Sequence, residues 1–231
     1  MERAAVALRV GLAVAYPWLA HAANARGDGL LAALALGDIA LIVLLGPLLR
    51  PRAWAWAALA ACVALLWALA RSAHPTLPLL LPPVLFLGLA AWLFARSLLP
   101  GRVPLITRIV APLYGSAPAD LAPALRRYTR GLTAAWALLL AGLGLANLAL
   151  ALFSVPGGLL ARLGLQPPLA VPAAHGSLFA NLLVYAVVAG FFLGEYAWRR
   201  RRFPQRPYRD LPDFLRRLAA LGPGFWRDAL R

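Results

Sequence analysis

Residues Leu30–Leu49 read LLAALALGDIALIVLLGPLL, an apolar run whose single charged side chain is Asp38. An α-helix rises about 1.5 Å per residue, so a run of roughly 20 residues crosses the hydrocarbon core of a bilayer. Five further runs share this length and this richness in Ala and Leu: Ala4–Ala23, Ala53–Ala70, Leu77–Ala95, Gly131–Phe153 and Leu178–Trp198. Because the runs are continuous and do not alternate with polar residues, they indicate helices and not barrel strands. The sequence predicts an all-α fold, a polytopic transmembrane helix bundle of about six spans over residues 1–198.

The composition excludes a water-soluble globular protein. Of the 231 residues, 62% are hydrophobic and only 13% are charged, which is more apolar surface than a soluble domain of this size can bury. The 23 basic residues are all arginines and stand against 8 acidic ones, for a formal charge of +15. The arginines gather at the ends of apolar runs, which is typical of contact with anionic lipid headgroups. The lone cysteine, Cys62, excludes an internal disulfide.

The distribution of arginines predicts the orientation. If six helices alternate across the membrane, one side carries the loop 96–130 and the tail 199–231, which alone holds ten arginines and three acids. The opposite side carries only Arg26, Arg71 and Arg162. Basic residues stay on the cytoplasmic side, so we expect both termini in the cytoplasm and the bundle in a bacterial inner membrane. Five spans would break this alternation.

The first run also has features of a secretory signal peptide, since Ala20-His21-Ala22 resembles a cleavage site. Five further runs follow, however, and Tyr16-Pro17-Trp18 interrupts the first one in a way that is unusual for a signal core. We therefore expect this helix to be retained.

Two connections and the tail are long enough to carry structure. The loop 96–130 is cytoplasmic in this arrangement, and the loop 154–176 faces outward with a single charge. In the tail, apolar residues recur on one helical face: Leu211, Phe214, Leu215, Leu218 and Leu221. This pattern predicts an amphipathic helix on the anionic inner leaflet. Nucleic-acid binding is the alternative for so basic a tail, but no groove-reading motif accompanies the charge, and we expect no nucleic-acid partner.

Asp38 is the outstanding polar residue, because a charged group near the middle of a span costs about 2.5–3.5 kcal/mol on insertion scales. The helical rise places Tyr16 at a similar depth, with the other polar residues nearer the outer surface. We therefore predict a polar cluster in the outer half of the bundle, formed by Tyr16, His21, Asp38, Asn147 and Asn181. This cluster is either a substrate pocket or proton-linked site, or a hydrogen-bonded clamp between helices in which Asp38 is neutral.

Glu195 lies four residues before Arg199, the order that favours an ion pair along a helix. We expect a structural ion pair at the membrane interface, with an active-site carboxylate as the alternative. The remaining candidates are arginines that would contact lipid phosphates or a soluble anionic partner: Arg102, Arg108, Arg126, Arg127, Arg200, Arg201 and Arg202.

Most enzyme templates are missing from the sequence. It has no HExxH, no phosphate-cradling glycine loop and no GxSxG elbow. The three histidines, His21, His74 and His175, fall near the outer ends of spans without a ligand-like spacing. We expect no metal and no cofactor, and enzymatic activity is the less favoured expectation.

Three stretches carry a resemblance to a known group of proteins: Ser97–Arg108 (SLLPGRVPLITR), Tyr128–Ala137 (YTRGLTAAWA) and Ser177–Pro204 (SLFANLLVYAVVAGFFLGEYAWRRRRFP). They resemble bacterial inner-membrane proteins whose genes accompany aryl-polyene, xanthomonadin-type pigment synthesis and its fatty-acid-like synthases. Some members are labelled ketosynthases, but the group has no established activity to carry over. A condensing enzyme needs an activated nucleophilic cysteine, and Cys62 has no His or Lys near it in sequence.

The resemblance implies a multi-pass inner-membrane accessory protein of a polyene or lipid-type pathway. Such a protein would anchor soluble synthase components or an acyl carrier protein through its arginine-rich loop, or would handle and export an apolar product. The alternative is a membrane-embedded lipid- or acyl-modifying enzyme that uses Asp38 or Glu195.

Overall fold

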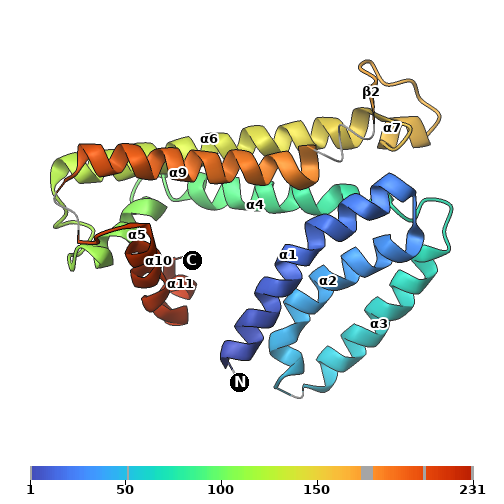
Figure 1. Cartoon of the computed structure of the whole chain (residues 1–231), viewed down its shortest axis with the longest axis horizontal. Helices are drawn as coiled ribbons and strands as arrows, with labels where there is room; N and C mark the ends of the chain where they lie inside the picture. The colour runs from blue at the N-terminus through green and yellow to red at the C-terminus, as the bar shows by residue number, and fades with distance from the viewer. Residues whose placement is uncertain (1, 51, 173–178, 205–206, 230–231) are drawn as a thin grey trace. The chain divides into compact units, whose positions relative to one another are not determined.

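The computed structural model describes residues 2–50, 52–172, 179–204 and 207–229. These residues are mostly helical, with very little strand, which confirms the predicted all-α fold (Figure 1). The strands within this part of the chain are β1 (Ser154–Val155) and β2 (Val171–Pro172), which pair in parallel. The chain forms two compact units, one of residues 1–84 and 146–187 and one of residues 85–145 and 188–231.

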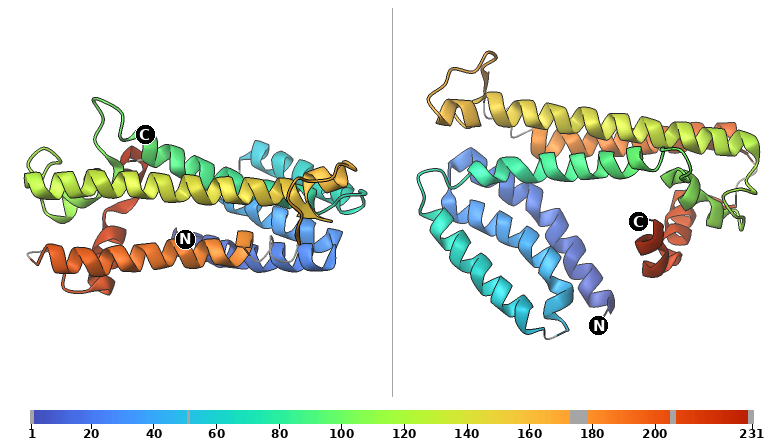
Figure 2. Two further views of the ribbon diagram at one scale, coloured as in Figure 1. Left: turned by 90° about the horizontal axis from the view of Figure 1, so that it is seen from above. Right: turned by 180° about the vertical axis from the view of Figure 1, so that it is seen from behind.

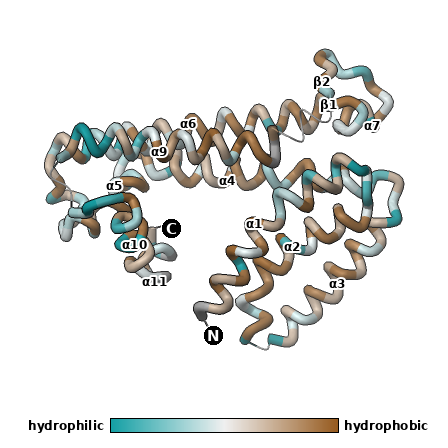
Figure 3. The backbone as a smooth tube through the Cα atoms, viewed as in Figure 1, coloured by the Kyte–Doolittle hydropathy of each residue, from teal (hydrophilic) through white to brown (hydrophobic). Residues whose placement is uncertain are grey.

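Five described helical segments are long and apolar enough to cross a membrane. They are α1 (Glu2–Arg26), α2 (Gly29–Leu48), α3 (Ala53–Ala70), the 3-10 turn η1 (Leu77–Leu80) continued by α4 (Leu81–Arg96), and α6 (Pro123–Phe153). They match the first five predicted runs, and Figure 3 shows apolar residues along most of their length.

The sixth predicted run, Leu178–Trp198, falls on the π-helical turn η2 (Phe179–Leu183) and α9 (Val184–Arg202), except for its first residue, which lies outside the described residues. This segment is not among the five. Its composition is less apolar, because α9 contains Glu195 and ends in the four arginines Arg199–Arg202.

In the first unit, α1, α2 and α3 follow one another as adjacent helices (Figure 1). Small residues bring α1 and α2 together, since Ala20, Ala23, Ala32 and Ala35 are buried in one cluster with Tyr16 and Leu79. Small side chains let two helix backbones approach closely, which is how helices associate in a bilayer, where lipid is as apolar as the protein. The helix α1 continues without interruption through Pro17 and ends at Arg26, beyond the predicted end at Ala23.

The beginning of α2 depends on two residues. The carboxylate of Asp28 accepts hydrogen bonds from the N–H groups of Leu30 and Leu31 at 2.8 and 3.2 Å, and so caps the helix. Next to it, Gly29 passes so close to the end of α3 that an added Cβ would lie 2.4 Å from the carbonyl oxygen of Ala70. Only glycine fits there without displacing one of the two helices.

In the second unit, aromatic side chains join three helices. The ring of Trp136 on α6 lies 6.1 Å from Phe94 on α4 and 4.8 Å from Phe191 on α9, measured between centroids. The two views of Figure 2 show these helices running alongside each other. Edge-to-face contact of the kind made by Trp136 and Phe191 is a favourable arrangement of aromatic rings.

The loop 96–130 and the tail are more helical than predicted. The loop contains α5 (Leu105–Leu113), and α6 begins inside it at Pro123. In the tail, α10 (Leu211–Ala220) occupies the predicted amphipathic segment, and α11 (Gly222–Ala229) follows directly. Gly222, with a φ of +77°, follows the end of α10 and begins α11, a second helix that the sequence pattern did not indicate. The loop 154–176 contains the short helix α7 (Leu159–Arg162).

Candidate functional site

Four arginines surround one pocket in the second unit. Arg126, Arg127 and Arg130 come from the first two turns of α6, and Arg102 follows the turn at Gly101, whose φ is +77°. The pocket has a volume of about 350 Å³, and its remaining walls come from Val103, Pro104, Thr107, Pro118 and Ala119. We call it the arginine pocket. Of the predicted anion contacts, the structure therefore brings Arg102, Arg126 and Arg127 together, and it adds Arg130, which the sequence did not single out.

The arginine pocket carries four positive charges. The guanidinium of Arg126 donates to the carbonyl oxygen of Ala119 at 3.1 Å, and that of Arg130 donates to the carbonyl oxygen of Leu98 at 3.3 Å. These bonds orient the two side chains but leave their charge. Over the described residues, none of the four forms an ion pair with a carboxylate. Guanidinium groups present several N–H donors in a planar fork, which suits carboxylate and phosphate groups.

Buried hydroxyl groups hold the wall of this pocket in place. Ser97 Oγ accepts the N–H of Leu105 at 2.9 Å, and Thr133 Oγ1 accepts the N–H of Ile106 at 3.3 Å. These bonds satisfy amides at the start of α5 that have no partner within the helix. The α5 residue Thr107, which lines the pocket, also lies 2.7 Å from Thr129, oxygen to oxygen.

Sequence reasoning missed these hydroxyls. The available signal was Pro104 directly before α5, together with two threonines spaced four apart on α6. All of them fall within the stretches Ser97–Arg108 and Tyr128–Ala137, so the residues that carry the resemblance include those that join α5 to α6.

Glu195 and Arg199 form the ion pair that their spacing predicts. Arg199 Nε lies 3.1 Å from Glu195 Oε1, and the two side chains are only 7% and 8% exposed. The hydroxyl of Tyr128 on α6 donates to the same carboxylate oxygen at 2.5 Å. The Glu195 carboxylate is thus engaged by Arg199 and Tyr128 within the protein, which leaves it poorly placed to act on a substrate.

Arg199 is also enclosed by aromatic rings. Its guanidinium carbon lies 4.8 Å from the ring centroid of Phe214, 5.7 Å from Tyr208 and 5.9 Å from Tyr196. A cation over an aromatic face is stabilised by the ring quadrupole, more so when it is desolvated. Burial raises the pKa of the Tyr208 hydroxyl, and the positive charge of Arg199 opposes this rise. The arrangement fastens the tail helix α10 to the end of α9.

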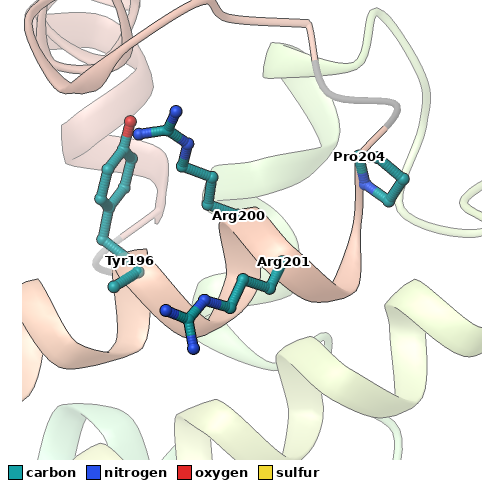
Figure 4. Close-up of a pocket in the computed structure, with 5 residues that line it drawn as sticks. Tyr196, Arg200, Arg201 and Pro204 are labelled. Carbon is teal, nitrogen blue, oxygen red and sulfur yellow. The ribbon is translucent and has the colours of Figure 1, made fainter.

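The predicted arginines at the end of α9 fall into two groups. Arg200 and Arg201 line a second pocket of about 530 Å³ together with Tyr196, Ala197 and Pro204. Figure 4 shows the Arg200 side chain rising next to the ring of Tyr196, with Arg201 directed away from Pro204. Arg202 instead lies 6.0 Å from the ring centroid of Phe203.

Arg108 does not contribute to either of these pockets. Its Nη1 donates to the carbonyl oxygens of Asp228 and Ala229, at 3.2 and 2.9 Å. It therefore holds the end of α11, where cations interact favourably with the last carbonyls of a helix. The expected anionic partner at Arg108 stays a prediction, and what the structure shows is this contact within the chain.

The predicted outer cluster is only partly visible in the first unit. Tyr16 and Asp38 are buried on adjacent helices, His21 is half-buried, and Asn147 is buried near the end of α6. The side chain of Asn181 lies outside the described residues. Neither the Tyr16 hydroxyl nor the Asp38 carboxyl group has a hydrogen-bond partner in the described part of the chain.

The histidines do not reveal a metal centre. Across the described ranges, no three His, Cys, Asp or Glu side chains lie close enough to hold a metal ion, and His175 is not among the residues described.

Comparisons of the chain with protein families, with characterised proteins and with solved structures find no match. The functional argument therefore depends on the residues themselves.

Proposed function

We propose that this chain is a multi-pass bacterial inner-membrane accessory protein that holds an anionic soluble partner at the cytoplasmic face. The observation that carries the proposal is the arginine pocket, where four arginines without a carboxylate partner surround about 350 Å³. The partner that fits the resemblance is an acyl carrier protein or another synthase component of a polyene or lipid-type pathway. A phosphate or carboxylate group of that partner would enter the pocket.

A contact between the loop and the tail supports six spans with both termini in the cytoplasm. Arg108 of α5 binds the end of α11, and Leu113 of α5 packs with Phe214 of α10. Segments in contact lie on the same side of a bilayer, so the chain between them crosses an even number of times. Because α6 is a candidate span, α9 must cross as well. The excess of arginines in the loop and the tail favours the cytoplasm as their common side.

The test is a binding measurement on the full chain in lipid nanodiscs. A variant carrying Arg102→Glu, Arg126→Glu and Arg127→Glu is expected to lose the capture of a purified, phosphopantetheine-bearing acyl carrier protein. As a matched control, three charge reversals at the exposed residues Arg209, Arg216 and Arg217 leave the pocket intact and should preserve capture. Equal capture by both variants would exclude anchoring through the arginine pocket.

The buried Asp38 favours a second function, the handling or export of an apolar product. Charged groups inside spans commonly mark a substrate or proton pathway. In the Asp38→Asn variant, export predicts that product still forms but stays in the inner membrane. If product formation stops while the protein level is unchanged, the enzyme alternative is favoured instead.

A further inference from the structure

Asp38 lies in the middle of α2, only 4% exposed. Its neighbours Ala35, Leu36 and Ile39 belong to or pack against the cluster that joins α1 to α2. Both carboxyl oxygens are buried, and neither has a hydrogen-bond partner among the residues described. If Asp38 joined two helices, its carboxyl group would need a hydrogen bond to a neighbouring helix. Among the described residues no such bond is present, so they give Asp38 no structural role.

Tyr16 is the polar side chain that α1 contributes to the same cluster. It is 7% exposed, and its hydroxyl oxygen is likewise buried without a partner in the described chain. It lies within electrostatic range of Asp38 and of Tyr185 on α9. Two buried polar groups on adjacent helices are thus left without an internal partner at about the same depth.

Among the described side chains of the closely packed elements, no basic group forms an ion pair with Asp38. On α1, Arg9 lies against Gly46, where an added Cβ would be 2.9 Å from Arg9 Nη2, about two helical turns from Asp38. On α3, which packs on the other side of α2, the only titratable residue is Cys62, and η1 has none. Tyr16 and Tyr185 are neutral phenols, and the histidine of α1, His21, lies five residues beyond Tyr16, so Asp38 is the only carboxyl group among the residues named here.

An ionised carboxylate without a cation or hydrogen-bond donor is strongly disfavoured in an apolar interior, and such a group takes up a proton instead. We propose that Asp38 and Tyr16 form an intramembrane proton-binding site. Asp38 holds an exchangeable proton, which passes to a water molecule when the site opens. The Tyr16 hydroxyl then donates a hydrogen bond to the carboxylate. The proton-binding site is a separate property from the proposed anchoring of a soluble partner, and it does not depend on the arginine pocket.

The experiment uses the full chain in lipid vesicles and dicyclohexylcarbodiimide, which modifies neutral carboxylic acids in apolar surroundings. Peptide mass spectrometry should locate the label at Asp38 at neutral pH, and the Asp38→Asn variant should lose it. Glu195 is the internal control, because its side chain is only 8% exposed but is paired with Arg199 and Tyr128. If Asp38 stays unlabelled, or if Glu195 is labelled as readily, the proposal is wrong.

Exchange of the proton is tested by the pH dependence of labelling. The rate should fall as pH rises, and in the Tyr16→Phe variant this fall should shift to higher pH because the carboxylate loses its donor. A rate that does not change with pH would mean that the proton never leaves, and it would overturn the proposal. An unshifted profile in Tyr16→Phe would remove Tyr16 from the site. Both outcomes are read from the Asp38-containing peptide, so neither requires the Asp38→Asn variant to fold.

Discussion

Glu195 and Arg199 place opposite charges where water scarcely reaches. Burying two ions is costly, and their attraction offsets that cost only when the geometry is good and the remaining polar atoms are bonded. Here the carboxylate receives the Tyr128 hydroxyl, and the guanidinium is covered by aromatic rings. The stability of this site therefore depends on Glu195, Arg199 and the side chains around them. Removing one of the two charges leaves the other buried without its partner.

The Glu195→Gln substitution should destabilise the protein by about 3 kcal/mol, since it leaves the Arg199 charge buried and unpaired. Thermal unfolding in detergent micelles would measure the change. Asp213→Asn is the matched control, because Asp213 and Arg217 form a pair with the same four-residue spacing on an exposed helix face. We expect the control to unfold like the wild type. Similar losses in both variants would show that burial of the first pair does not matter.

For individual residues, the sequence spacing predicted the ion pair of Glu195 with Arg199. It predicted neither the contact of Tyr128 with Glu195 nor the aromatic rings around Arg199. A four-residue spacing is a local property of one helix. Tyr128 lies 67 residues away from Glu195 in the chain, and Phe214 belongs to a different helix, so their approach depends on tertiary packing that a pattern does not contain. The same limit applies to Arg108, whose partners are carbonyls at the far end of the chain.

The apolar face of the tail helix α10 packs partly against the protein and is partly exposed. The apolar face was expected to lie on lipid, but its central residue, Phe214, is only 5% exposed and packs with Leu113 and Tyr208. Leu215, on the same face, is 46% exposed and remains available to the bilayer surface. The hydrogen bond from the Arg209 N–H and the charge of Arg217 hold the pKa of the Asp213 carboxyl group below its usual value. The stability that the charged Asp213 gives to the start of α10 is therefore lost only in acid.

Phe214→Ala should release α10 from the bundle, because it removes the ring that covers Arg199 and fills the space between α5 and α9. Loss of a buried phenylalanine costs about 3–5 kcal/mol, enough to undock a single short helix. Limited trypsin digestion of membranes should then cut at Arg216 and Arg217 much faster than in the wild type. Leu215→Ala, a change of similar size at an exposed site, should keep the wild-type rate. Equal cleavage in all three proteins would contradict the docked position of α10.

The long helices could be predicted from the length and hydropathy of their apolar runs. The short helices could not, because contacts with other parts of the chain stabilise them. The apolar runs fixed α1 to α4 and α6 because length and hydropathy alone decide whether a helix spans a bilayer. In contrast, α5 has only nine residues and takes its first hydrogen bonds from Ser97 and Thr133. A helix this short is marginal by itself. Its existence depends on hydroxyl groups from two other parts of the chain.

For the whole molecule, length and composition give five candidate spans among the described residues, whereas the topology that we propose has six, with α6 and α9 crossing as a pair between α5 and its contacts on α10 and α11. The segment α9 is less apolar because of its charges, two of which, Glu195 and Arg199, pair with each other. A hydropathy scale counts such charges at full cost.

Reporter fusions provide the measurement. An alkaline phosphatase domain, which is active only after export, should be inactive when fused after Ala220 and after Ala119, and active when fused after Leu163. Green fluorescent protein should give the opposite result at each position. Activity of the phosphatase after Ala220 together with inactivity after Ala119 would place loop and tail on opposite sides and exclude their contact.

The hydrogen bonds from Arg108 to the last carbonyls of α11 have a consequence for the purification of the protein. Arg108 and Arg102 line the same small hollow, together with Ala229 of α11. Deleting α11, or cleaving it off, would set a fifth guanidinium free beside those of the arginine pocket. A shortened chain would thus retain polyanions such as heparin more strongly than the intact one, and an affinity tag appended to the end would risk the same artefact.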